Sequence, residues 1–211
     1  GSDMQAGETM LRAGTRLRPA EINLLAAFGL TQVQVCRRPE VAILSTGDEL
    51  VPPGETPGPG QIVDSNAYSL AAAVRELGGV PKLLGIARDQ QSSLFGKINQ
   101  GLQADMLITT AGVAMGDRDL VCETLTEAGV EQLFWKVGMK PGGPTAFGLY
   151  GDTPVFSLPG NPVSSMIGFE QLVRPALLKM MGRSDLFRPT AQARLREELR
   201  SGVGMVALLR S

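Results

Sequence analysis

Apolar residues along this chain fall into two alternating patterns. Short continuous apolar runs are typical of strands that are buried on both faces of a sheet. Such runs, or similar strand-like stretches, cover residues 41–45, 83–87, 106–109, 132–137 and 155–158. Between them apolar residues recur at helical spacing, as do Leu70, Ala73, Val74 and Leu77. Strands that alternate with helices through short loops predict an α/β fold: a three-layer, mostly parallel open sheet with helices on both faces.

Polar residues mark where several of these helices begin. Asp89 is predicted to cap the helix that follows the strand over residues 83–87, and Asp117 is predicted to cap the next one. Asn161 caps a long last helix, in which Pro162 occupies the first turn. We expect Pro175 to kink that helix, because proline has no backbone N–H to donate.

The two ends of the chain lack this regular alternation. Residues 1–40 are predicted to be a leading segment with a short helix from Pro19 and a short strand over residues 33–36. Residues 41–182 are predicted to form the α/β domain. Residues 183–211 are predicted to be a linker and a strand-like stub without partner strands, which is too short to bury a core. We therefore expect short β segments at both ends and a further domain that is present only in part.

Composition removes several classes of chemistry. The chain contains no histidine, which excludes histidine-based triads, histidine metal ligands and imidazole pH switches. Cys36 and Cys122 lie far apart, which favours reduced thiols in a cytoplasmic protein. The formal net charge of −1 provides no overall basic field for nucleic acid or a membrane surface. No apolar run approaches the roughly 20 residues of a membrane span.

The candidate chemistry lies in the loops that follow the predicted strands, where open α/β sheets bind their ligands. These loops contain Thr46-Gly47-Asp48-Glu49, Arg88-Asp89, the segment 111–119 and the segment 158–164. Glycine-rich turns let backbone N–H groups approach phosphate oxygens, and hydroxyl groups add donors. The hydroxyl residues concerned are Thr46, Thr109, Thr110 and Ser164. Together these loops predict a phosphorylated or nucleotide-like ligand.

Two charged sets refine this prediction. Several carboxylates beside a phosphate site indicate a divalent cation with oxygen ligands, typically Mg²⁺. Lys136 and Lys140 are candidates for binding a second, separate oxyanion. Each residue also has a purely structural interpretation: Asp117 as a helix cap, Glu49 as a solvated strand end, and Glu170 as a partner in a local ion pair. It is the combination of four loops at one sheet edge that favours function.

Four ordered motifs carry a resemblance to a known family. They are STGDEL at residues 45–50, GVAMGDRD at 112–119, MKPG at 139–142 and LPGNPVS at 158–164. In this order and spacing the chain resembles the molybdopterin molybdenumtransferase (MoeA) family, which includes the E domain of gephyrin. The resemblance covers about residues 7–189. It implies that residues 41–182 adopt a fold similar to molybdopterin adenylyltransferase (MogA-like), and that residues 190–211 begin a small C-terminal β-barrel.

The resemblance also implies a reaction in molybdenum cofactor biosynthesis. The family uses Mg²⁺ to insert molybdate into adenylated molybdopterin with release of AMP, and it works as a cytoplasmic homodimer. An upstream adenylyltransferase and downstream molybdoenzymes are the implied partners. Glu49, Asp89 and Asp119 match catalytic, metal-binding positions. The expected molybdopterin- and oxyanion-binding residues are Thr46, Gly47, Asp48, Thr110, Gly112, Gly116, Asp117, Lys136, Lys140, Pro159, Asn161, Pro162 and Ser164.

The chain departs from the family pattern at three positions. Where the family reads SGGVS, this chain has Ala111 and Ala114, which restrict a backbone position and remove a hydroxyl. Where the family reads KPGKP, Gly143 replaces a lysine expected at the molybdate site. Three functions therefore stay open: a fragment of a molybdenum transferase, an adenylyltransferase-like variant that handles the nucleotide, and a non-catalytic molybdopterin-binding or scaffold module.

Overall fold

The computed structural model describes residue 5 and residues 7–111, 120–194, 196 and 204–208, and it centres on one six-stranded sheet with the order β4-β1-β5-β9-β8-β6. The strands β1 (Glu40–Thr46), β4 (Val80–Ala87), β5 (Met106–Thr110) and β9 (Thr153–Leu158) pair in parallel. The strands β8 (Ala146–Tyr150) and β6 (Glu131–Phe134) complete one side in antiparallel pairs. The predicted three-layer, mostly parallel α/β fold is confirmed.

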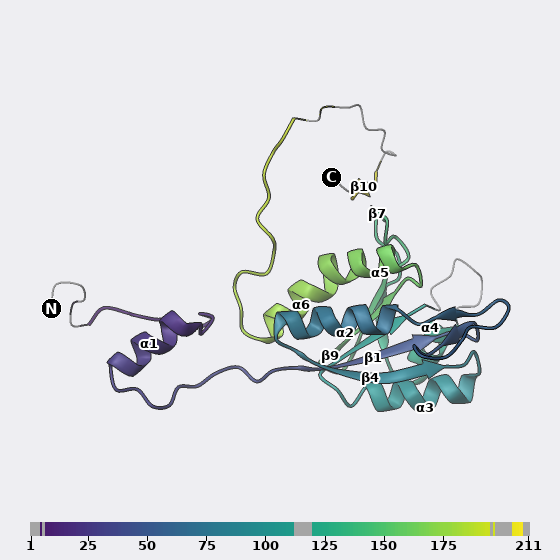
Figure 1. The fold of residues 1–211 in the computed structure, drawn as a ribbon, viewed down its shortest axis with the longest axis horizontal. Coiled ribbons are helices and arrows are strands. Elements are labelled where there is room, and N and C mark those ends of the chain that lie inside the picture. Colours follow the sequence, from purple (N-terminus) through teal and green to yellow (C-terminus); the bar gives the residue numbers. More distant parts are fainter. Residues whose placement is uncertain (1–4, 6, 112–119, 195, 197–203, 209–211) are drawn as a thin grey trace.

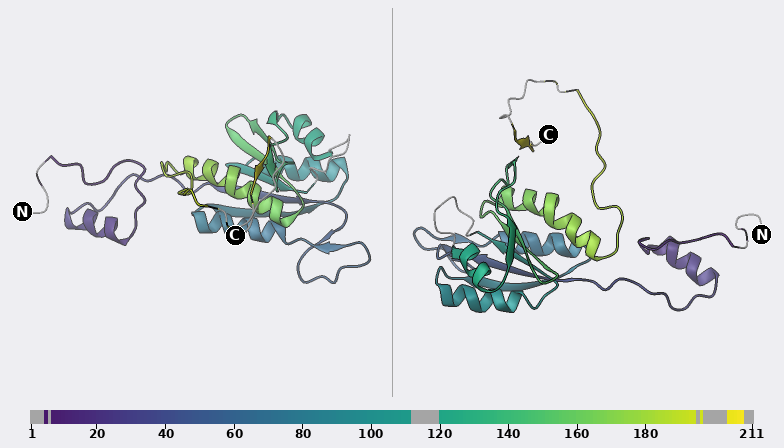
Figure 2. Two further views of the ribbon diagram at one scale, coloured as in Figure 1. Left: turned by 90° about the horizontal axis from the view of Figure 1, so that it is seen from above. Right: turned by 180° about the vertical axis from the view of Figure 1, so that it is seen from behind.

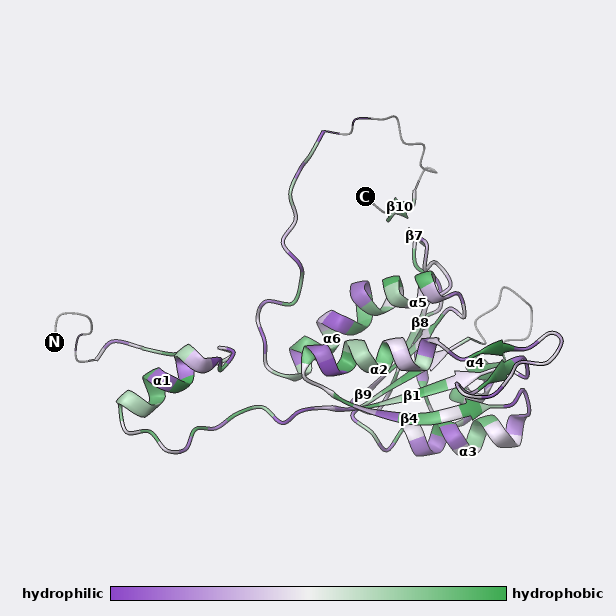
Figure 3. Cartoon of the chain, in the orientation of Figure 1, coloured by the Kyte–Doolittle hydropathy of each residue, from purple (hydrophilic) through white to green (hydrophobic). Residues whose placement is uncertain are grey.

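Two hydrophobic clusters hold the layers together, one on each face of the sheet (Figure 1). Side chains of a strand alternate between faces, so Val41 and Ile43 of β1 enter one cluster while Ala42 and Leu44 enter the other. Burial on both faces explains why β1 is a continuous apolar run instead of an alternating one. Figure 3 shows the hydrophobic residues along the strands, between the layers of helices.

The helices on the two faces begin and end largely as predicted. The first face carries α2 (Asn66–Leu77), α5 (Pro162–Gly168) and α6 (Arg174–Met180), and the second carries α3 (Gln91–Gly101) and α4 (Leu120–Glu127). Gly78 ends α2 with a left-handed φ of 105°. The predicted cap of α5 is confirmed, because Asn161 Oδ1 accepts a hydrogen bond from Ser164 N at 3.1 Å.

Two helix predictions need correction or refinement. Asp89 does not cap α3, because Gln90 occupies the N-cap position and makes no side-chain cap bond. The expected kink at Pro175 takes the form of a π-helical turn, η1 (Phe169–Val173), between α5 and α6. A proline removes one N–H from the helical ladder, and a single wider turn absorbs the mismatch. The predicted cap at Asp117 lies outside the described residues.

Several short strands were not predicted. They are β2 (Leu50–Val51), β3 (Ile62–Val63) and β7 (Met139–Lys140), in addition to β8. The prediction of a C-terminal stub without a partner strand is wrong, because β10 (Val206–Ala207) pairs in parallel with β7. A two-residue strand needs only one exposed neighbouring edge, and β7 supplies that edge.

The leading segment is separate from the sheet, as both views in Figure 2 show. Its predicted helix is confirmed as α1 (Pro19–Ala27), none of whose residues is buried. The predicted strand over residues 33–36 is wrong: these residues are exposed and form no strand. An alternating pattern can form a strand only beside a second strand, and the described sheets offer none there. Among the residues that the structure describes, the expected β segment therefore occurs at the C-terminal end and not in the leading segment. None of the helices in the described part of the chain has the length and apolarity to cross a membrane.

Candidate functional site

The four parallel strands place the predicted loops side by side. In the sheet order β4, β1, β5 and β9 are consecutive neighbours, so their carboxyl ends form one continuous edge. The strand register aligns Thr46 with Ala87, Ser45 with Thr110, and Thr110 with Leu158. This edge, which we call the carboxyl edge, therefore brings together the segments after residues 46, 87, 110 and 158. It is the place where an open α/β sheet binds its ligand.

Hydrogen bonds tie the loop after β1 to the loop after β4. Arg88 Nη1 donates to the carbonyl oxygens of Asp48 and Leu50, each at 3.1 Å. Asp89 N donates to Asp48 Oδ1 at 3.2 Å. These bonds place Asp48, Glu49 and Asp89 in one corner of the carboxyl edge, as the sequence predicted. None of the ion pairs in the described part of the chain involves these three carboxylates.

Gly47 fixes the position of the Glu49 side chain. Gly47 is buried, has φ 140°, and donates its N–H to Ala87 O at 3.1 Å. A Cβ atom at this position would lie 2.4 Å from Glu49 Oε2, which means that the Glu49 carboxylate folds back over the glycine. Only glycine meets both the backbone conformation and the close approach. Gly47 thus holds the Glu49 carboxylate against the end of β1.

A second corner joins the loops after β5 and β9. Asn66 Nδ2 donates to Thr110 Oγ1 at 2.9 Å and to Gly160 O at 2.8 Å. Ala111 N donates to Leu158 O at 3.2 Å, and a Cβ on Gly160 would lie 3.2 Å from Ala111 Cβ. Ala111 has φ 69°, a left-handed conformation that the alanine adopts where the family has glycine. The alanine thus occupies a backbone conformation that favours glycine, and an effect of this departure on ligand binding stays a prediction.

The loop that carries Lys140 packs against the start of α5. A Cβ on Gly142, whose φ is 98°, would lie 2.9 Å from Met139 Cε and 3.4 Å from Ser164 O. Lys140 lies in β7 and Lys136 lies shortly before it, and both side chains are exposed. The structure thus brings the predicted Lys140 loop to the helix start that contains Ser164. In the same region Pro159 is buried, whereas Asn161 and Pro162 are exposed.

Unpaired buried oxygens mark the carboxyl edge and the starts of α2 and α5. Six buried polar side-chain atoms of the described residues have no hydrogen-bond partner, and all except Arg174 Nε are oxygens in this region. These oxygens belong to Ser45, Thr46, Asn66, Thr109 and Ser165. Buried polar groups in proteins are nearly always hydrogen-bonded, to protein, water or a ligand. These oxygens are therefore candidates for hydrogen bonds to water or to a bound polar molecule.

Sequence reasoning identified part of this set. Thr46 and Thr109 were predicted as ligand donors, and the polar ends of otherwise apolar strands were the signal. Ser45 has the same signal and was missed as a candidate. Asn66 and Ser165 were also missed, since each lies in an ordinary helical start and only the tertiary structure brings it to the edge.

Part of the predicted site lies outside the described residues: Gly112, Gly116, Asp117 and Asp119. Among the residues that are described, no group of three or more acidic, cysteine or histidine side chains is arranged to hold a metal ion. The predicted metal set includes Asp119, so two of its three carboxylates, Glu49 and Asp89, can be placed. Both supply oxygen atoms only, which is the donor type that Mg²⁺ prefers.

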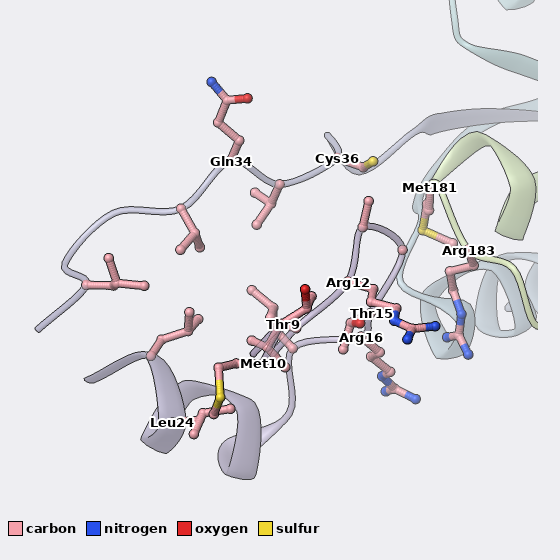
Figure 4. A pocket seen from close by; sticks show the side chains of 18 of the residues that line it. Thr9, Met10, Arg12, Thr15, Arg16, Leu24, Gln34, Cys36, Met181 and Arg183 are labelled. Carbon is pink, nitrogen blue, oxygen red and sulfur yellow. The ribbon is translucent and has the colours of Figure 1, made fainter. Parts of the chain in front are cut away.

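A large open cavity of about 1580 Å³ lies elsewhere (Figure 4). It is bounded by the leading segment on one side and by the ends of α2 and α6, including Met181 and Arg183, on the other. Since α2 runs back from the carboxyl edge, its C-terminal end lies at the opposite edge of the sheet. The cavity is therefore distinct from the candidate site.

The fold and the loop edge define an open α/β domain with a candidate ligand site at its carboxyl edge. Comparison with known proteins agrees with this fold. Residues 42–179 match the family described as probable molybdopterin binding domain. The chain belongs to this family.

Similar proteins carry related names. The chain is 40% identical over 213 residues to molybdopterin molybdenumtransferase 2 of Mycobacterium tuberculosis, a match that covers 97% of this chain and 52% of that protein. It is 41% identical to molybdopterin molybdenumtransferase of Nostoc sp., covering 93% of this chain and 46% of the relative. The crystal structure of the molybdopterin biosynthesis MoeA protein from Pyrococcus horikosii has a TM-score of 0.74 at 38% identity, covering 82% and 43% of the two chains. The chain thus spans about half the length of the curated relatives it matches.

Proposed function

We propose that this chain is the molybdopterin-binding part of a molybdenum transferase and that it binds adenylated molybdopterin at the carboxyl edge. The observation that carries the proposal is the set of unpaired buried oxygens beside four converging loops. The names of the relatives support it, since proteins similar along nearly the whole chain are molybdopterin molybdenumtransferases. The reaction, inserting molybdate and releasing AMP, would belong to the longer protein.

Each corner of the edge has a role in this proposal. Glu49 and Asp89, with Asp119, would hold Mg²⁺, which neutralises phosphate charge when bound. Asp48 supports this corner by holding the loop of Asp89 through its backbone N–H. Thr46, Gly47 and Thr110, with Gly112, Gly116 and Asp117, would line the phosphate chain. Pro159, Asn161 and Pro162 would form the wall beside it.

The exposed lysines form the second part of the site. Lys136, Lys140 and Ser164 would bind molybdate, because the Lys140 loop packs beside the first turn of α5. An exposed ammonium group attracts an oxyanion without a fixed geometry. The homodimer, the upstream adenylyltransferase, the downstream molybdoenzymes and the cytoplasmic location implied by the family are proposed for the longer protein.

Calorimetric titration of this chain with molybdopterin, with and without Mg²⁺, tests the proposal. We expect binding that Mg²⁺ strengthens in the wild type, and an Mg²⁺ effect that is lost in Glu49→Gln. Glu123→Gln provides the matched control, since Glu123 is exposed on α4. Absence of molybdopterin binding by the folded wild type would refute the proposal. Equal loss of the Mg²⁺ effect in Glu49→Gln and Glu123→Gln would contradict the role assigned to Glu49.

Gly143 favours a second candidate, in which the domain handles the pterin nucleotide without molybdate. A Cβ on Gly143 would lie 3.0 Å from Met139 O, so a side chain there requires a small backbone shift. Gly143→Ala introduces this contact without charge and is the control for Gly143→Lys. If the molybdate site lies here, the lysine variant gains molybdate affinity over the alanine variant. Equal molybdate affinities of Gly143→Lys and Gly143→Ala would exclude the explanation that a lysine at this position is needed for molybdate binding.

A further inference from the structure

The side chain of Asn66 takes no part in capping the helix that this residue begins. Asn66 is the first residue of α2, and it is 8% exposed. The side chain that caps this helix start is instead Asp64, whose Oδ1 accepts from Ala67 N at 3.2 Å. Asn66 makes its side-chain bonds across the sheet edge, to Thr110 and Gly160, which lie 44 and 94 residues away in the sequence.

The orientation of the Asn66 amide is determined by its partners. Gly160 O can only accept a hydrogen bond, so the atom 2.8 Å from it must be the amide nitrogen. The same nitrogen donates to Thr110 Oγ1, and both of its protons are thereby used. The other amide atom, Oδ1, is consequently directed away from both partners. It is buried and has no hydrogen-bond partner among the described residues.

An unpaired Oδ1 is unfavourable in a residue that serves structure alone. A buried acceptor left without a donor loses the hydrogen bonds that water would give it in the unfolded chain, which destabilises the fold. Ser45, beside Thr110 in the β1–β5 register and on the same face of the sheet, also has an unpaired buried hydroxyl. Two neighbouring unpaired groups at one point of the carboxyl edge indicate a place where a ligand makes hydrogen bonds.

We propose that Asn66 positions two ligand loops and binds the ligand directly. Its nitrogen fixes the spacing between Thr110 and Gly160, and its Oδ1 accepts a hydrogen bond from an N–H or O–H group of the ligand. A carbonyl oxygen cannot bond to a fully ionised phosphate, which has no donor. The donor is therefore a heterocyclic N–H, as on a pterin, or a hydroxyl, as on a ribose. This inference rests on the proposed function for the identity of the ligand.

Two probes and two readouts test the inference on this chain. Molybdopterin and AMP are titrated separately, and hydrogen–deuterium exchange is followed in residues 106–111 and 158–164 without ligand. Asn66→Leu removes both functions of the amide. We expect about thirtyfold weaker binding of whichever probe supplies the donor, the combined effect of several lost hydrogen bonds. We also expect faster exchange in both segments.

Matched variants separate positioning from general destabilisation. The isosteric Thr110→Val removes the acceptor for Asn66 and should bind about fivefold more weakly than Thr110→Ser, which retains it. Ser69→Ala, which removes a hydroxyl on the same helix, should change neither readout. Asn66→Ser replaces the leucine variant if the latter does not fold.

The outcomes are distinct. A selective loss of molybdopterin affinity places the pterin at Asn66, and a selective loss of AMP affinity places the ribose there. Wild-type affinity for both probes in the Asn66 variants overturns the binding role, and unchanged exchange overturns the positioning role. If the wild type binds neither probe, the proposed function and the binding role fail together, and the exchange data alone decide whether Asn66 holds the loops.

Discussion

Ala111 adopts a left-handed backbone conformation at the point where β5 enters the candidate site. This conformation costs an L-residue about 1–2 kcal/mol, because Cβ approaches the following carbonyl oxygen. Glycine removes that cost but is disfavoured by about 0.5–1 kcal/mol through its greater freedom in the unfolded chain. We therefore expect Ala111→Gly to raise the free energy of unfolding by about 0.5 kcal/mol, measured by urea denaturation.

The same substitution in a helix is the control for Ala111→Gly. Ala72 is exposed within α2, where the backbone is helical and glycine is unfavourable. Ala72→Gly should lower the free energy of unfolding by roughly 0.5–1 kcal/mol. Opposite signs for the two variants support strain at Ala111. A loss of stability in both would show that the left-handed conformation is not strained.

At the residue scale, the sequence predicts chemistry better than it predicts contacts. The departure at Ala111 could be noted from the resemblance to the family pattern, which has glycine at this position. The fold-back of Glu49 over Gly47 could not, since it depends on side-chain direction. Asn66 was missed for the same reason: its partners are distant in sequence, and only the sheet order brings them together.

The turn between α3 and β5 contains the main electrostatic link between the sheet and the segment before β1. Asp105 accepts hydrogen bonds from both terminal nitrogens of Arg37, each at 2.5 Å, and from Glu40 N at 2.7 Å. The hydrogen bonds from Arg37 lower the pKa of Asp105 below its usual value. Asp105→Asn should therefore destabilise the domain at pH 7 by roughly 0.5–1 kcal/mol, as for a partly exposed ion pair.

The difference in stability between wild type and Asp105→Asn should become smaller as the pH falls. A carboxyl group whose pKa is lower in the folded state stabilises the protein above its unfolded pKa of about 3.9. The stabilisation is lost as the pH falls through the lower, folded value. The free energies of unfolding of wild type and Asp105→Asn, measured by urea denaturation, should thus converge as the pH falls below the unfolded pKa of about 3.9. Asp152→Asn, in an exposed turn, should show no such trend, and a gap that persists at low pH would contradict the ionic explanation.

The β7–β10 pair offers a test at the level of single hydrogen bonds. Val206 N donates to Gly138 O at 2.8 Å and Leu208 N donates to Lys140 O at 2.9 Å. In a parallel pair alternate amides face the neighbouring strand, so the amide of Ala207 faces away from β7. Val206→Pro should speed deuterium exchange in residues 204–208, whereas Ala207→Pro should not. Equal effects would mean that the pairing does not depend on these bonds.

The elements with a clear pattern in their own sequence were predicted, whereas the short strands that form only beside another strand were not. The strands β1, β5 and β9 are almost wholly buried, whereas β4 is buried only at Leu84 and Ala87; the apolar composition of all four predicts them. β8 alternates in burial and contains Gly148, which weakens its strand signal. Residues 33–36 show the reverse error, because their alternation predicts a strand that has nothing to pair with.

On the scale of the whole molecule, the leading segment adds little to the hydrophobic core. The two hydrophobic clusters begin at Val41 and Ala42, and α1 contributes no buried residue. Phe28 and Val35 of the leading segment are 55% and 69% exposed. A segment that buries so little adds little to stability, because hydrophobic stabilisation scales with the apolar area removed from water.

Removal of residues 1–36 should therefore leave both the fold and the candidate site intact. Arg37 and Arg38 are retained because Arg37 bonds to Asp105 and Arg38 Nε donates to Gly78 O at 2.6 Å. We expect the melting temperature to change by no more than about 2 °C, the shift that a few tenths of a kcal/mol produce.

Removal of residues 1–39 is the control: it also deletes both arginines and the buried Pro39, and it should lower the melting temperature. Because the carboxyl edge lies at the far end of the sheet, the shorter truncation should also retain molybdopterin affinity. A large loss of stability in that truncation would mean that the leading segment is part of the folding unit.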